Sequence, residues 1–287
     1  MFYLTKSTST RIRESIEPTL RYAMETEAHV HALAFAASVL LSFFPFLIVM
    51  LSIARNLLHL PEAVNAVFLA LRDYFPDELF VFMKRNLMAV LESRRPLQLF
   101  SLFLLLLTAN AVFLPLEVAL NRIWGATGNR PYWKNQLLSL ALIFACGALA
   151  MLSFVLAAVN RQVLGAMLGV RSGAPYWISV AFFKLAAIPA SILGLFLVYW
   201  LVPNRKIAPL RVLPAAILVG VALEAVKNIN LAIWPLFKSK LQSEYGPFYI
   251  SVTVVLFSFA AAMVVLAGAE WAARRERERA PAPTDGE

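Results

Sequence analysis

Six long runs of apolar residues, separated by mostly short polar connections, form the main pattern of this chain. A helix needs about 20 mostly uncharged residues to cross the roughly 30 Å hydrocarbon core of a bilayer. Each run reaches that length, so the pattern predicts an all-α, polytopic membrane protein with six transmembrane helices. The runs cover residues 32–54, 97–116, 137–159, 176–202, 212–234 and 248–271.

Lys and Arg residues are distributed unevenly between the connections, and this asymmetry predicts the orientation. Fourteen of them lie before the first run and after the second, fourth and sixth, whereas four lie in the two short connections on the other side. The longer connection, residues 55–96, adds six to that other side. Since short connections rich in Lys and Arg stay in the cytoplasm, we expect both termini there.

The chain divides into an arm (residues 1–29), a six-helix membrane domain (residues 30–272) and a tail (residues 273–287). In the arm, apolar residues recur at every fourth position, which is typical of an amphipathic helix on a membrane surface. These are Ile12, Ile16, Leu20 and Met24. Pro18 interrupts this helix or begins its second half. The tail is charged and ends in Pro, Ala and polar residues, so we expect it to be disordered and cytoplasmic.

The connection of residues 55–96 predicts two short amphipathic helices on the outer side. Each sequence, PEAVNAVFLALRDYF and PDELFVFMKRNLMAVLESRRP, begins with Pro and an acidic residue, the composition of a helix N-terminus. In the second, apolar residues at helical spacing fall on one side: Leu79, Met83, Leu87, Val90 and Leu91. We expect the two helices to lie against the outer membrane face or to cap the bundle.

Composition agrees with the membrane class and explains the net charge. The chain is 60% hydrophobic and 15% charged, whereas soluble domains have about 25% charged residues. The net charge of +9 fits basic cytoplasmic edges that face anionic lipid headgroups. A nucleic-acid surface would need a basic domain outside the runs, and none is visible. The expected partners are therefore membrane lipids and not nucleic acid.

The fifth run contains polar residues where lipid would require apolar ones, in the sequence GVALEAVKNINLAIW. A charge at the centre of a membrane helix raises the insertion free energy by about 2.5–3.5 kcal/mol, so these residues should face inward. Glu224, Lys227 and Asn228 follow helical spacing and share one face, where Glu224 can pair with Lys227. We interpret this face as part of a substrate or ion pathway. A purely structural ion pair is the competing interpretation.

Two further residues extend the pathway hypothesis, and two prolines could act as hinges. Asn110 in the second run and Lys184 in the fourth are candidate pathway residues, although Lys184 can also extend outward to the membrane surface. Pro45 and Pro189 lie at similar depths in the first and fourth runs. Prolines in membrane helices free a backbone carbonyl, so these two predict bending points or packing kinks.

Three polar residues lie near the cytoplasmic ends of the second and sixth runs: Glu117, Asn121 and Glu270. We interpret them as interfacial residues, because only a short reach separates them from water.

Enzymatic motifs are missing from the sequence. It contains no glycine-rich phosphate loop, no nucleophile elbow and no metalloprotease helix motif. His29 and His31 flank the first run without a cluster of acidic residues, and Cys146 is the only cysteine. We therefore expect no enzyme activity, no metal and no cofactor.

Five segments carry a resemblance to a known family. They are SVLLSFFPFLIVMLSI in the first run, LEVALNRIWG after the second, LVPNRKI after the fourth, YGPFY before the sixth and VVLAGAEW at its end. In their order and spacing the chain resembles the YihY/BrkB family of bacterial inner-membrane proteins. The resemblance implies six transmembrane helices with both ends inside. It covers residues 30–272, but the first run has FAASV where the family often has tyrosines.

The function expected from these features is transport. Members of the family have been described as transporter-like proteins and as virulence or serum-resistance factors. We expect the chain to move an amphipathic or anionic solute, such as a lipid or envelope precursor, without ATP hydrolysis. The alternative is a non-transporting scaffold for envelope assembly. Small residues in AAIPASILG and AGAEW permit close helix contacts, within one subunit or in a homo-oligomer.

Overall fold

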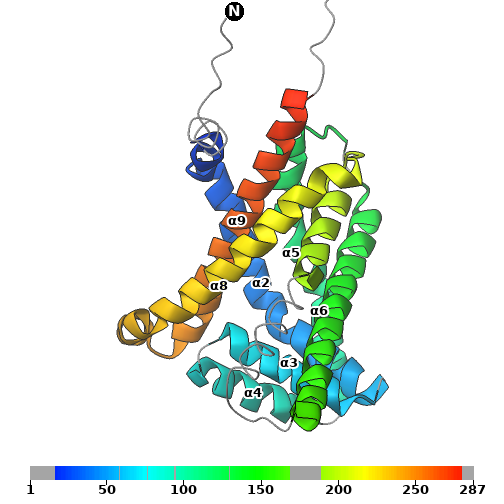
Figure 1. Cartoon of the computed structure of the whole chain (residues 1–287). Coiled ribbons are helices and arrows are strands. Elements are labelled where there is room, and N and C mark those ends of the chain that lie inside the picture. The colour runs from blue at the N-terminus through cyan, green and yellow to red at the C-terminus, as the bar shows by residue number, and fades with distance from the viewer. Residues whose placement is uncertain are drawn as a thin grey trace, which may run out of the picture.

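The computed structural model describes residues 17–168, except 58, 76, 94 and 129, and residues 189–279. All regular elements in these ranges are helices (Figure 1). Five apolar runs lie, to within two residues at their ends, inside long helices: α2 (Thr26–Ser52), α5 (Arg95–Trp124), α6 (Tyr132–Leu168), α8 (Pro209–Tyr245) and α9 (Tyr249–Arg279). Of the fourth run, only the end is described, within the helical segment Pro189–Leu201. Lys184 lies outside the described residues.

Three stretches of the described residues are long and apolar enough to cross a membrane: Glu27–Leu57, Leu99–Trp124 and Pro209–Glu278. The third stretch contains two helices, because the short turn η2 (Gly246–Phe248) separates α8 from α9. Gly246 has a φ of 50°, a left-handed conformation that glycine adopts without strain. The chain reverses at this turn, and α9 packs back along α8 (Figure 1).

Helix α2 lies at the centre of the molecule and packs against α5 and α9, while α6 packs against α5. The beginning of the described chain and the end of α9 lie at one end of the molecule, which we call the termini end (Figure 1). The side chains of Thr19 and Glu270 meet there at 3.0 Å. Leu20 and Met24 of the arm are exposed, and Ile12 and Ile16 lie outside the described residues.

The helices extend beyond the apolar runs that predicted them. Helix α8 continues to Tyr245, and α9 continues to Arg279, so the charged beginning of the tail is helical. The expected disorder therefore does not begin at residue 273, because charged pairs one turn apart, such as Arg274 and Glu278 at 4.0 Å, favour the helix. Hydropathy detects only the apolar part of a helix and misses its polar extension beyond the membrane.

Two shorter helices, α3 (Pro61–Tyr74) and α4 (Asp77–Leu91), occupy the region predicted to contain them, at the end opposite the termini (Figure 1). The predicted apolar side of α4 is buried except for Val90, which is half-buried; the buried residues are Leu79, Met83, Leu87 and Leu91. At the start of α4, the carboxylate of Glu78 accepts a hydrogen bond from Lys238 of α8 at 2.7 Å. This bond, with one from Trp234, lowers the pKa of Glu78.

A stripe of large apolar side chains on α5 is exposed at intervals of one or two turns. Its members are Leu99, Phe103, Leu107, Leu114 and Val118. Exposure of such a stripe is unfavourable in water but is the normal condition of a helix side that contacts lipid. The side chain of Asn110 on the same helix is not among those described.

Pro45 is buried within α2, which continues through it to Ser52 and then forms a π-helical turn, Ile53–Leu57. Pro189 is the first residue of its described segment, so the helix before it lies outside the described residues. The hinge role of both prolines stays a prediction.

Small residues bring α8, α9 and the segment Pro189–Leu201 close together. A Cβ atom at Gly268 would lie 2.1 Å from Cγ2 of Val219 and 3.1 Å from the hydroxyl of Tyr199. That hydroxyl donates a hydrogen bond to the carbonyl of Val265 at 2.7 Å. The AGAEW sequence therefore serves contacts between helices of the same chain.

We expect Gly268→Ala to lower the thermal unfolding temperature in detergent, because the branched side chain of Val219 has little freedom to move away. Overpacking of this kind costs about 1–3 kcal/mol. Gly128→Ala is the matched control, since a Cβ there meets nothing within 4 Å. Equal unfolding temperatures for the two variants would contradict the close approach.

Candidate anion-binding site

Three of the five segments that carry the family resemblance meet at the termini end. They are residues 116–125 at the end of α5, residues 201–207 in the connection before α8, and residues 264–271 near the end of α9. Hydrogen bonds and ion pairs join the first segment to the second, and the second to the end of α9. We call the place where these three segments meet the junction.

Glu117 is the buried centre of the junction. Its side chain is 6% exposed and accepts hydrogen bonds from the amides of Asn135 on α6 and Asn204 in the connection, the latter at 3.0 Å. Asn121 accepts a hydrogen bond from the backbone N–H of Asn204 at 2.6 Å. Burial of a carboxylate is costly unless donors surround it. Glu117 therefore bonds to protein where we expected it to reach water.

Arg130, which lies just before α6, holds the same connection in place. Its guanidinium donates hydrogen bonds to the carbonyls of Leu201, Val202 and Pro203 at 2.9, 3.2 and 3.0 Å. Carbonyls at the end of a helix lack partners within the helix, and a cation there also interacts favourably with the helix dipole. The connection that carries Arg205 is thus held at both its beginning and its middle.

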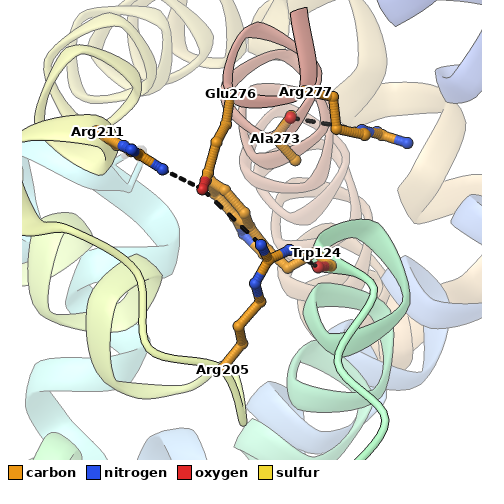
Figure 2. Close-up of polar contacts among 6 residues, drawn as sticks. All are labelled: Trp124, Arg205, Arg211, Ala273, Glu276 and Arg277. Carbon is orange, nitrogen blue, oxygen red and sulfur yellow. Dashed lines mark hydrogen bonds and ion pairs between the residues drawn. The ribbon is translucent and has the colours of Figure 1, made fainter. Parts of the chain in front are cut away.

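Arg205 and Arg211 reach the same carboxylate oxygen of Glu276 from two different elements (Figure 2). Arg211 pairs closely with this Oε1 atom, and Arg205 lies 4.0 Å from it. Arg205 also donates to the carbonyl of Trp124 at 2.8 Å. The other oxygen of Glu276, Oε2, is buried and has no hydrogen-bond partner among the described residues. The protein itself thus places one anion between two guanidinium groups.

These residues line a cavity of about 710 Å³, which we call the arginine pocket. Five arginines and one carboxylate give it a positive charge: Arg122, Arg205, Arg211, Arg275, Arg277 and Glu276. The remaining wall is largely apolar, including Trp124, Leu210, Pro214 and Trp271. The indole Nε1 of Trp124 is buried without a hydrogen-bond partner in the described part of the chain. Clustered cations beside apolar walls can bind an anionic amphiphile.

A smaller cavity of about 350 Å³ lies beside the arginine pocket, under the arm. Arg122 and Arg277 border both cavities, and Glu270 lines this one. Burial, with the nearby carboxylates of Glu25 and Glu270, raises the pKa of Tyr22 to about 12, so its hydroxyl keeps its proton. Glu270 accepts a hydrogen bond from Thr19 at 3.0 Å, which fixes the arm to the end of α9.

The residues predicted to form a pathway lie farther along α8. Glu224 and Lys227 form the predicted ion pair, in which Lys227 is buried and the side chain of Glu224 is 32% exposed. Asn228 is exposed and donates to the carbonyl of Glu224 at 2.7 Å. Glu224 is about 20 Å from Arg211 by the helical rise of 1.5 Å per residue. The ion pair borders neither the arginine pocket nor the smaller cavity beside it.

Another cavity of about 350 Å³ lies between α8 and α9, and we call it the α8–α9 groove; it begins at Val226, beside the ion pair, and continues to Leu241. Asn230 and Thr253 are its polar residues, and its other walls are mostly aliphatic and aromatic. Asn230 of α8 thus borders this groove.

The sequence did not single out the arginine pocket. We used Arg205 and Arg211 only as positive charges that predict the membrane orientation, and we assigned Glu276 to the disordered tail. The available signal was that Arg205 and Trp124 both lie in segments that resemble the family. Nothing in the pattern indicates that α9 continues far enough to bring Glu276 beside them.

Comparison with known proteins identifies the family. The model of the family described as "Virulence factor BrkB" matches residues 19–287. The chain belongs to this family. A UPF0761 membrane protein of Acinetobacter baylyi is 27% identical over 248 residues, which cover 84% of this chain and 57% of that protein. The match thus spans little more than half the length of that relative. No solved structure matches the chain. The BrkB-family chain is a membrane protein, as its apolar helices predict.

We expect Asn204→Ala to lower the thermal unfolding temperature, because it removes a donor to the buried Glu117 carboxylate. A hydrogen bond to a charged group contributes about 1.5–3 kcal/mol. Asn86→Ala is the control, since Asn86 is exposed and donates to the carbonyl of Phe82 in its own helix. If both variants unfold at the same temperature in a differential scanning measurement, Asn204 does not stabilise the junction.

Proposed function

We propose that this BrkB-family chain crosses a bacterial inner membrane six times, with both termini in the cytoplasm. The asymmetry of Lys and Arg supports this orientation. Among the fourteen Lys and Arg residues assigned to the cytoplasmic side, the arginines that line the arginine pocket lie at the termini end. Lys238 and Lys240, which are assigned to the outer side, lie near the α8–α9 turn at the other end of α8. In this orientation α3 and α4 are on the outer side, and the arginine pocket opens at the cytoplasmic membrane surface.

Within that membrane the protein moves an anionic amphipathic solute, such as a lipid or an envelope precursor, without ATP hydrolysis and without a chemical reaction. The observation that carries this proposal is the arginine pocket. Its guanidinium groups suit a negatively charged headgroup, and its apolar wall suits the adjoining hydrocarbon chain. Arg122, Arg205 and Arg211 would bind the solute as it enters from the cytoplasmic leaflet.

Helix α8 connects the three features that a pathway would need. Arg211 lies at its cytoplasmic end, Glu224 and Lys227 lie near its middle, and the α8–α9 groove follows toward the outer side. In this proposal Glu224 accepts a proton or cation, Lys227 is its partner or contacts the anion, and Asn228, Asn110 and Lys184 are further pathway residues. Pro45 and Pro189 are the bending points.

A scaffold for envelope assembly is the second candidate. Apolar side chains around α3 and α4 remain exposed, including Leu57, Val81 and Phe82. An exposed apolar patch on an outer helix can serve as a docking surface for another protein or can rest on the membrane. A scaffold would leave lipid movement in reconstituted vesicles at the rate of protein-free vesicles.

We expect Arg211→Ala to reduce the movement of fluorescent phosphatidate across reconstituted vesicles about tenfold, because one of two cations at the anion position is lost. The measurement is dithionite quenching of the outer-leaflet fluorophore over time. Lys240→Ala is the control, as it removes an exposed cation far from the pocket. Equal rates for Arg211→Ala and the unaltered protein would exclude the arginine pocket from transport.

A second variant tests the middle of the pathway. We expect Glu224→Gln to abolish phosphatidate movement in the same vesicles, because a neutral amide cannot take up a proton and lacks the negative charge that attracts a cation. Glu244→Gln, which alters an exposed carboxylate near the end of α8, should retain the original rate. Unchanged movement with Glu224→Gln would leave the ion pair a structural role only.

A further inference from the structure

We propose that the arginine pocket binds the doubly charged phosphate of a phosphomonoester amphiphile, and that Glu276 is an internal competitor which this ligand displaces. The inference rests on the proposed function, since it specifies the solute for the same pocket. It also assigns Glu276 a role that is distinct from that of the arginines. Glu276 sets the selectivity of the pocket by occupying the anion position in the absence of ligand.

The position of the anion follows from the contacts of Glu276. Its Oε1 atom lies between guanidinium groups from the connection and from α8 (Figure 2). Phosphate oxygens occupy the same positions relative to arginine as carboxylate oxygens, often with two parallel hydrogen bonds. The carboxylate therefore marks where a phosphate oxygen would bind. Because Oε2 has no hydrogen-bond partner among the described residues, Glu276 uses only half of its own bonding capacity.

The surrounding charge exceeds what Glu276 can neutralise. Arg122 pairs with Glu27, but Arg275 lies over the ring of Trp271 at 4.7 Å, and Arg277 donates to the carbonyl of Ala273 at 3.4 Å. A ring and a carbonyl stabilise a guanidinium without neutralising its charge. Arg205 and Arg211 share the single carboxylate of Glu276. The pocket thus has positive charge available for an anion with more than one negative charge.

This surplus determines which anions can replace Glu276. A group tethered next to its binding position has an effective concentration in the millimolar range, so a free ligand must interact more strongly to displace it. A singly charged phosphodiester would only exchange one negative charge for another. A phosphomonoester has a charge of about −1.5 to −2 near neutral pH and three strong acceptor oxygens. The exchange is therefore favourable for a phosphomonoester and much less so for a phosphodiester.

Two properties of the wall favour an amphiphile over free phosphate. The volume of about 710 Å³ lies within the range of pockets for ligands much larger than a phosphate ion. Leu210, Pro214 and Trp271 offer apolar surface to a hydrocarbon chain.

The test is a binding measurement on the full chain in a non-ionic maltoside detergent at pH 8, by isothermal titration calorimetry. The probes are dodecyl phosphate, dodecyl methyl phosphate and inorganic phosphate, which separate the phosphomonoester, the singly charged phosphodiester and the free ion. We expect dodecyl phosphate to bind at least tenfold more tightly than either of the others. Arg211→Ala should weaken this binding about tenfold or more.

The variants of Glu276 distinguish the internal competitor from an ordinary pocket residue. Glu276→Gln should bind dodecyl phosphate about tenfold more tightly than the unaltered protein, because the tethered charge is gone. It should also reduce the preference for dodecyl phosphate over dodecyl methyl phosphate. Glu276→Asp, which keeps the charge on a shorter side chain, should bind dodecyl phosphate with an affinity between those of the unaltered protein and Glu276→Gln. Glu278→Gln is the matched control: Glu278 is on the same helix, but its side chain is 67% exposed and pairs with Arg274.

The contrary outcomes distinguish the competitor role of Glu276 from the proposed function. If Glu276→Gln and Glu276→Asp bind no more tightly while Arg211→Ala loses binding, the competitor role is overturned and the proposed function stands. If folded protein, as judged by its unfolding transition, binds none of the probes in any variant, both proposals are overturned. If inorganic phosphate binds as tightly as dodecyl phosphate, the occupant is the free ion and the amphiphile is excluded.

Discussion

The buried carboxylate of Glu117 is the interaction on which the termini end depends. A charge removed from water must be surrounded by donors, and here the donors come from α6 and from the connection before α8. Glu117 thereby joins three separate parts of the chain at one point. Arg130 bonds to the carbonyls that precede Asn204, so the chain immediately before Arg205 is held by both a guanidinium and a carboxylate.

The arginine pocket is a consequence of this junction. Arg205 extends from the fixed connection, Arg211 from the beginning of α8 and Glu276 from the extended end of α9. Close packing at Gly268 keeps α9 next to α8 and the segment Pro189–Leu201. The arginines that predict the membrane orientation thus also line a concave site. The proposed solute is one that needs both the cationic and the apolar surface of that site.

Within the described residues, the sequence predicted where long helices occur, because membrane helices require long apolar runs and amphipathic helices show their period. The ion pair of Glu224 and Lys227 was also predictable, since residues three apart on a helix always lie close together. Burial of Glu117 was not, because its partner Asn204 is 87 residues away and only the fold decides whether a carboxylate meets water or an amide. The same limitation applies to Glu276, whose partners lie on other elements.

The most direct measurement of the anion site is a cryo-electron microscopy structure of the full chain in nanodiscs that contain phosphatidate. We expect density for a phosphate headgroup between Arg205 and Arg211, its acyl chains along Leu210 and Trp271, and the carboxylate of Glu276 turned away from both guanidinium groups. A map that resolves these side chains but shows Glu276 still bound to Arg211, with no lipid density in the pocket, would contradict this interpretation.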